Sequence, residues 1–139
     1  MNVLVDTSVW SLALRRKAED LNTTEKAIVA ELKELIGEGR ARMIGLVRQE
    51  LLSGIKTSEQ FEKLKTILRS FPDEQIHTAD HEIAAKASNS CRSRGIAVSV
   101  VDVLVCAIAV SREWPIFTTD PDFHKYALAV PIKLYALRK

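Results

Sequence analysis

Four acidic side chains stand where an α/β chain could bring them together. Asp6 directly follows the apolar run NVLV, and Asp120 follows the run PIFT, with one threonine between them. Glu50 lies beyond a third apolar run, RMIGL, and Asp102 interrupts the most hydrophobic segment, 98–110. An ionised carboxylate is costly to remove from water unless something pairs with it. Clustered carboxylates suit a hard divalent cation, which prefers oxygen ligands.

Each acid also has a purely structural explanation. Asp6 and Asp120 can be turn residues or helix N-caps, and Glu50 can be a solvated helix residue. Asp102 lies three residues after Ser99 and can reach back to the amide of that cap. Their joint placement favours one shared site, because two of them follow apolar strands and one sits in an otherwise apolar segment.

The elements that must position these acids alternate along the whole chain. Apolar runs predict strands at 2–5, 42–46, 74–77, 115–118 and 132–135. Amphipathic or capped segments predict helices from 8, over 22–39, 47–54, 58–71, 78–94 and 99–112, and a short one opened by 119–121 with its proline at the first helical position. This alternation predicts an α/β fold with a mostly parallel sheet flanked by helices. Such sheets bind ligands at the carboxyl ends of their strands, where Asp6 and Asp120 would emerge.

The size and composition of the chain fit an ordinary globular protein. With 139 residues, it suits a single domain over 1–139 with one core. The start MNVLVD has no signal-peptide features, and the longest apolar run is too short to span a membrane, so we expect a cytoplasmic protein. Cys91 and Cys106 lack metal-site spacing and predict free thiols, and the three scattered histidines predict surface residues.

The charge balance becomes basic once the four acids are set aside. The 18 acidic residues then fall to 14, against 20 basic residues. Arg15 and Arg16 follow the Asp6 loop and are the preferred candidates for contacts with backbone phosphates. Further candidates, which can equally be solvated helix charges, are Lys17, Arg48, Lys56, Arg92 and Arg94.

Four motifs together carry a resemblance to a known family. VLVDTSVW, RQELLSG, VSVVDVLVCAIA and IFTTDPDF, in this order and spacing, resemble the PIN-domain ribonucleases, and most closely their VapC-type toxins. The resemblance covers the chain from Met1 to about Tyr135, with Gly45 standing where relatives often have Ser or Thr. It implies a three-layer PIN-like fold and an acidic set that holds Mg²⁺ or Mn²⁺.

The resemblance also implies roles for individual residues. Asp6 and Asp102 would be the principal metal ligands, and Glu50 and Asp120 would complete the site directly or through water. The neighbouring side chains expected to orient or assist these carboxylates are Thr7, Ser8, Thr118 and Asp122.

Partners are implied in the same way. VapC-type toxins cleave RNA, are inhibited by a cognate VapB-like antitoxin and commonly form homodimers. The apolar faces of the helices predicted at 22–39 and 58–71 can form a groove for an antitoxin helix, or can be core.

Other classes of protein fit the residues less well. A haloacid-dehalogenase-type phosphatase needs a second Asp where Ser8 stands, and a receiver module usually has an acidic pair near its first strand, which this chain lacks. A PIN-fold nuclease that processes RNA without an antitoxin stays open. So does an inactive PIN-fold binding module, although the four intact acids argue against it.

Overall fold

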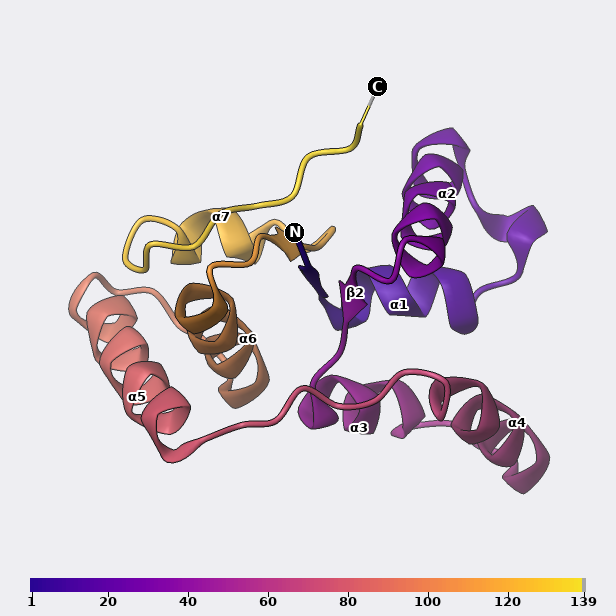
Figure 1. Cartoon of the computed structure of the whole chain (residues 1–139), viewed down its shortest axis with the longest axis horizontal. Helices are drawn as coiled ribbons and strands as arrows, with labels where there is room; N and C mark the ends of the chain where they lie inside the picture. The colour runs from indigo at the N-terminus through magenta and orange to yellow at the C-terminus, as the bar shows by residue number, and fades with distance from the viewer. Residues whose placement is uncertain (139) are drawn as a thin grey trace.

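A three-stranded parallel sheet forms the centre of the computed structural model, which describes residues 1–138 (Figure 1). Strand β1 (Val3–Val5) lies between β2 (Ala41–Arg42) and β3 (Ile116–Phe117), in the order β2-β1-β3. Helices cover both faces of these strands, which gives three layers. The predicted α/β fold with a mostly parallel sheet is confirmed.

The register of the sheet decides which residues meet at its carboxyl edge. Leu4 pairs with Arg42 on one side and with Ile116 on the other, and all three residues of β1 are buried. Because both pairings are parallel, the chain leaves Val5 and Phe117 at the same edge. The residues that follow these two positions are therefore neighbours.

The predicted strand over 42–46 is wrong in its extent. Strand β2 ends at Arg42, and helix α3 (Gly45–Leu52) begins three residues later. Met43 and Ile44 are buried in the core, which explains their apolar character without a strand. As a result Glu50 lies in the last turn of α3, and not at the start of a helix as expected.

The two further predicted strands, at 74–77 and 132–135, are wrong: an isolated bridge lies within 132–135, and the other bridge lies at Asp73, just before 74–77. Asp73 bridges to Met43, and Leu134 bridges to Ile116, both in parallel. A short apolar run fits either a strand or an extended segment over the core, and only the pairing partner decides between them.

The helices fall close to the predicted segments. Helices α5 and α6 pack side by side at one end of the molecule, while α1 and α2 lie together on the other side of the strands (Figure 1). None of the helices in residues 1–138 is both long and apolar enough to cross a membrane. Besides α3 and a short 3-10 helix at Ala18–Asp20, the helices are α1 (Thr7–Leu14), α2 (Thr23–Gly37), α4 (Ser58–Leu68), α5 (Thr78–Ser93), α6 (Val100–Arg112) and α7 (Asp122–Tyr126).

Local capping explains where several helices begin. Asn22 and Glu25 form the predicted capping box at the start of α2. Ser99 caps α6 as predicted. At α5 the residue type of Thr78 favours an N-cap, but the cap is His77 and Thr78 is the first helical residue. Pro121 occupies the N-cap of α7, one position before the predicted one.

The core is built around β1 and the middle of α6. Residues 103–109 of α6 are all buried, which confirms the buried helix predicted there. Trp10 is fully buried and donates its indole N–H to the carbonyl oxygen of Val5 at 3.1 Å. Cys91 and Cys106 are buried free thiols.

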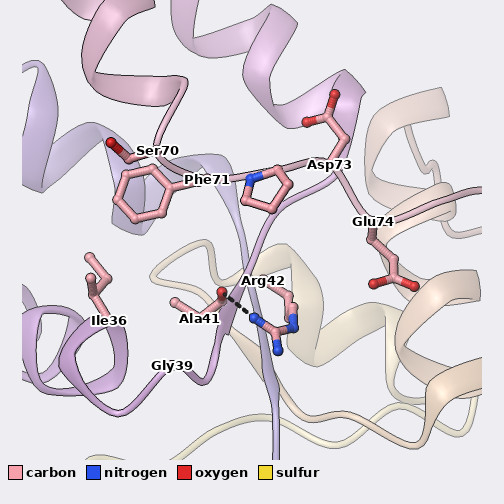
Figure 2. A pocket seen from close by; sticks show the side chains of 9 residues that line it. Ile36, Gly39, Ala41, Arg42, Ser70, Phe71, Asp73 and Glu74 are labelled. Atoms are coloured by element: carbon pink, nitrogen blue, oxygen red, sulfur yellow. Dashed lines mark hydrogen bonds between the residues drawn. The ribbon is translucent and has the colours of Figure 1, made fainter.

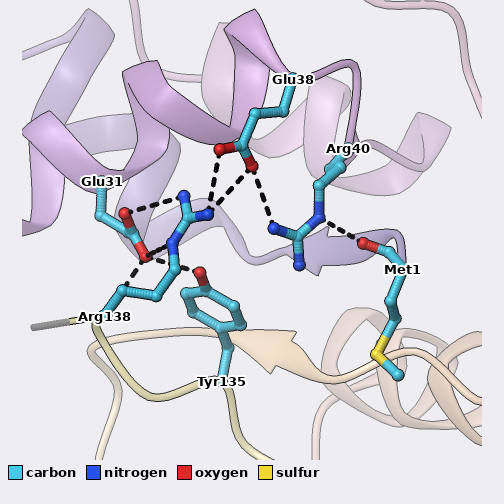
Figure 3. Close-up of polar contacts among 6 residues, drawn as sticks. All are labelled: Met1, Glu31, Glu38, Arg40, Tyr135 and Arg138. Carbon is cyan, nitrogen blue, oxygen red and sulfur yellow. Dashed lines mark hydrogen bonds and ion pairs between the residues drawn. The ribbon is translucent and has the colours of Figure 1, made fainter.

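The C-terminal segment is clamped onto α2 (Figure 3). The guanidinium of Arg138 binds Glu31 and Glu38, each at 3.0 Å, and the hydroxyl of Tyr135 donates to Glu31 at 2.5 Å. Arg138 lowers the pKa of the Glu31 carboxyl, whose burial acts in the opposite direction. This cluster ties the segment after β3 to the first half of the chain.

Candidate active site

Asp6 lies at the carboxyl edge of the sheet, directly after β1, and is only 4% exposed. Its backbone N–H donates to the carbonyl of Phe117 in β3 at 2.9 Å. Its Oδ2 accepts hydrogen bonds from the hydroxyls of Ser8 at 2.9 Å and Thr118 at 2.8 Å. Burial raises the pKa of the Asp6 carboxyl, and these two hydroxyls partly offset the rise. The result is a buried carboxylate in a fixed orientation.

Glu50 reaches the same edge from α3. The hydroxyl of Thr7, the first residue of α1, donates to its Oε1 at 2.5 Å. This contact holds the end of the Glu50 side chain against the start of α1, next to Asp6. Thr7 thus orients Glu50, while its neighbour Ser8 orients Asp6.

Asp102 enters the site from the first turn of α6. Its backbone N–H donates to the hydroxyl of Ser99 at 3.0 Å, which is one half of the predicted capping box. Its carboxylate instead accepts a hydrogen bond at Oδ2 from the hydroxyl of Tyr126, at 2.7 Å. Tyr126 is buried in α7 and was missed in the sequence. The only signal for it in the sequence is its place three residues after Phe123, which is typical of one apolar helix face and does not indicate a contact with Asp102.

The pKa of Asp102 depends on the three other candidate acids. Burial raises this pKa, the Tyr126 hydrogen bond lowers it, and the negative charges of Asp6, Asp120 and Glu50 raise it further. The fold therefore brings the other three predicted acids near enough to Asp102 for their charges to act on it. Burial and the Asp102 hydrogen bond also raise the pKa of the Tyr126 hydroxyl, so this group is protonated and available as a donor.

Asp120 is held in the turn that follows β3. Its N–H donates to the Thr118 hydroxyl at 3.0 Å, and its Oδ1 accepts from the N–H of Asp122 at 2.9 Å. The structural role considered for Asp120 is thus present beside its place in the acidic cluster. Asp122 faces Lys125, with 3.6 Å between the charged groups, and half of its side chain is exposed.

The donor set fits a hard divalent cation. All four acids offer carboxylate oxygens, and their mutual repulsion would be relieved by positive charge. Within residues 1–138, no group of three carboxylate, histidine or cysteine side chains is arranged to hold a metal ion by itself. Magnesium is typically bound by one or two carboxylates together with water, so this geometry is compatible with it.

A model of the PIN domain family matches residues 3–128 of this chain. The chain belongs to the PIN domain family. The matched range contains all four acids and Tyr126. No curated protein matches the sequence closely enough to count as a relative.

Solved structures share the fold of this PIN domain at low sequence identity. FitAcB from Neisseria gonorrhoeae has a TM-score of 0.75 at 20% identity, covering 96% of each chain. VapBC2 from Rickettsia felis, bound to a DNA fragment from their promoter, has a TM-score of 0.73 at 15% identity, covering 97% of this chain and 98% of that one. VapBC-1 from nontypeable Haemophilus influenzae has a TM-score of 0.73 at 14% identity, covering both chains fully. These likenesses establish the fold.

The basic residues of the PIN domain differ in their surroundings. Arg15 is exposed and lines a pocket with Thr7 and Glu50. Arg16 is paired with Glu25 at 3.8 Å. Arg48, considered above as a phosphate contact, is instead bound to Asp73 at 2.9 Å and to two backbone carbonyls at and beyond the end of α4. These partners give Arg48 a structural role.

Another pocket of the PIN domain lies away from the acids (Figure 2). It has a volume of about 380 Å³ and is formed by the end of α2, by β2 and by residues 70–74. Its charged groups are Arg42, Asp73 and Glu74, and none of the four candidate acids lines it. This pocket is therefore separate from the candidate active site.

Proposed function

We propose that this PIN domain is a metal-dependent endoribonuclease that acts as the toxin of a toxin–antitoxin pair. The observation that carries the proposal is the position of the Asp102 carboxylate, which lies near enough to Asp6, Glu50 and Asp120 for their negative charges to raise its pKa. Such a concentration of negative charge destabilises the fold by repulsion. Membership of the PIN domain family supplies a reason for it, because acidic side chains in a nuclease would hold a divalent cation. The whole chain, 1–139, would act as one domain.

Mg²⁺ or Mn²⁺ is the proposed cofactor. Asp6 and Asp102 would be its principal ligands, with Glu50 and Asp120 completing the site directly or through water. The chemistry that such an ion supplies when bound is activation of water and stabilisation of negative charge on the phosphate.

The protein's own groups would position the reaction. The hydroxyls of Ser8 and Thr118 fix the orientation of Asp6, and the hydroxyl of Thr7 fixes one oxygen of Glu50. The other oxygen of Glu50 is then free to accept a proton from the attacking water and orient it. Arg15 and Arg16 would contact phosphates on either side of the scissile bond.

A protein partner is the second part of the proposal. A pocket of about 310 Å³ between the end of α1 and α4 is lined by the aliphatic side chains of Leu14, Ile55, Leu64 and Ile67, and by the polar side chains of Arg15, Gln60 and Lys63. Ile67 is 40% exposed, and such a groove suits the apolar face of an antitoxin helix. In α2, by contrast, Leu32 and Leu35 belong to the core, so α4 would supply the groove. We also propose a homodimer located in the cytoplasm.

The nuclease proposal is tested by incubating purified protein with structured RNAs in Mg²⁺, Mn²⁺ or EDTA. We expect cleavage only with metal, and at least a hundredfold loss of rate in Asp6→Asn and Asp102→Asn, because each change removes a ligand charge. Circular dichroism should show both variants folded. Wild-type activity in either variant would rule out the proposed site, and no cleavage of any RNA with either metal would rule out the activity.

The toxin role is tested separately. A short reading frame for a small DNA-binding protein beside this gene, whose product copurifies with this chain and blocks cleavage, is the expected finding. Cleavage without any such partner would favour the alternative of an RNA-processing nuclease.

A further inference from the structure

A pocket opens directly beside Glu50. Its volume is about 390 Å³, within the range of roughly 300–1,000 Å³ that is usual for small-ligand sites. Both ends of α1 contribute to it through Thr7 and Arg15, and α3 contributes Gln49 and Glu50. The pocket therefore continues the acidic cluster away from Asp6.

Both apolar and polar side chains line this pocket. Leu46 of α3 and Val101 of α6 are half-buried and line it, and neighbouring Val100 is 76% exposed. The side chains of Arg15 and Gln49 are exposed, and within residues 1–138 neither makes a hydrogen bond or an ion pair. These two groups are free to bind a ligand.

Aliphatic side chains, one amide and one guanidinium together can bind the parts of a single nucleotide. A nucleobase has apolar faces that pack on aliphatic side chains, and an edge of donors and acceptors that an amide can pair with. A guanidinium binds a phosphate through two parallel hydrogen bonds. Proteins read RNA sequence mainly from such unstacked, single-stranded bases.

We propose that this pocket binds one unstacked nucleotide next to the scissile phosphate, with Gln49 contacting the base edge and Arg15 the phosphate. The inference rests on the proposed ribonuclease function and extends it, because it makes Gln49 the residue that selects where the RNA is cut. The groove beside α4 is also lined by Arg15, together with Gln60 and Lys63, but none of the four acids lines it. The pocket beside Glu50 is therefore the one that adjoins the proposed site of cleavage.

The test uses the full chain with Mg²⁺ and short hairpin RNAs whose loops are randomised, followed by sequencing of the products. We expect the wild type to prefer one base at one position next to the cut. Gln49→Leu, which keeps the size of the side chain but removes its amide, should lower that preference about tenfold. Arg15→Ala should raise KM about tenfold for every sequence and leave the preference unchanged.

Two controls separate this assignment from other causes. Gln75→Ala removes another exposed glutamine, remote from the pocket, and should retain the wild-type preference. Titration with Mn²⁺ should give the same affinity for Gln49→Leu as for wild type, because Gln49 is outside the acidic cluster.

Two results would overturn the assignment while leaving the nuclease function intact. One is cleavage by the wild type without any base preference. The other is an unchanged preference in Gln49→Leu, which is also what a pocket filled by a protein partner would give. If the wild type cleaves no RNA under any condition, the proposed function fails, and this assignment fails with it.

Discussion

At the scale of single residues, the site is defined by hydroxyl groups as much as by acids. Ser8, Thr118, Thr7 and Tyr126 each donate to one of the carboxylates. Each donor satisfies one carboxylate oxygen and fixes its direction, which is how enzymes hold metal ligands in place. None of them removes the repulsion among the acids.

That repulsion predicts that Asp102→Asn stabilises the metal-free protein. The folded-state pKa of Asp102 is raised, so its cost is absent below the unfolded pKa of 3.8 and grows as pH rises through the folded value. At pH 7 we expect a gain of about 1 kcal/mol, or roughly 4 °C in Tm. Calorimetry in EDTA at acid and neutral pH measures this. The exposed Asp122→Asn is the control and should change little; a less stable Asp102→Asn at neutral pH would contradict the prediction.

Tyr126 should act on metal binding through Asp102. Tyr126→Phe keeps the packing against Phe123, whose ring centroid lies 5.0 Å away, and removes only the hydroxyl. With Asp102 no longer held, we expect the affinity for Mn²⁺ to fall by about ten- to a hundredfold. Isothermal titration calorimetry measures this directly.

Tyr135→Phe is the matched control for that experiment. Tyr135 also donates its hydroxyl to a carboxylate, that of Glu31, but in the C-terminal clamp. Its loss should lower stability and leave Mn²⁺ affinity as in wild type. Equal Mn²⁺ affinities in wild type and Tyr126→Phe would show that the Tyr126 hydroxyl only supports the fold.

At the scale of elements, α5 and α6 are joined by a buried ion pair. Arg112, in the last turn of α6, binds both oxygens of Asp80 in the first turn of α5, at 2.6 and 3.0 Å. It also donates to the carbonyl of Gln75 at 2.7 Å. Asp80 is 1% exposed, and Arg112 lowers the pKa of its carboxyl to about 2. The α5–α6 pair carries Asp102 into the site, so this contact supports the site from a distance.

Arg112→Met should therefore cost about 3 kcal/mol of unfolding free energy at pH 7, since it leaves a buried carboxylate without its partner. Because the folded pKa of Asp80 is depressed, its contribution is present above pH 3.8 and is lost as pH falls toward 2. Urea unfolding at pH 7 and pH 3 should show a smaller difference between variant and wild type at the lower pH. The double variant with Asp80→Asn should recover part of the loss. A cost well under 1 kcal/mol for Arg112→Met would show that the pair is dispensable.

Helices were predictable where their signals are local. The Asn22–Glu25 box and the Ser99 cap act within one turn, and both mark the true helix starts. Strands were less predictable, because pairing depends on residues far away: the run at 132–135 makes only one bridge, and the run at 74–77 makes none. The same limit hid the partner of Arg48, which lies 25 positions along the chain.

At the scale of the whole molecule, the grouping of the acids followed from topology. Asp6 and Asp120 could be expected at one edge because each follows an apolar strand, and the parallel order of β1 and β3 confirms that expectation. The Tyr126–Asp102 hydrogen bond could not be derived, because it depends on how α7 docks on α6.

The site is built from residues far apart in the sequence, so we expect activity and fold to be lost together. The Thr118–Asp6 hydrogen bond joins positions 112 residues apart. In urea, we expect the same midpoint from far-ultraviolet circular dichroism, tryptophan fluorescence and metal-dependent cleavage. An earlier loss of cleavage would indicate that the site opens as a separate unit.

The same hydrogen bond has a consequence for how the protein is made. Asp6 is synthesised early, but one of the two hydroxyls that orient it belongs to Thr118, which follows β3 and is synthesised 112 residues later. A nascent or broken chain that stops before Thr118 carries three of the four acids and an unassembled centre. Under the proposed activity, a chain would therefore begin to cleave RNA only after its synthesis is nearly complete. Incomplete chains would not cleave the RNA around them.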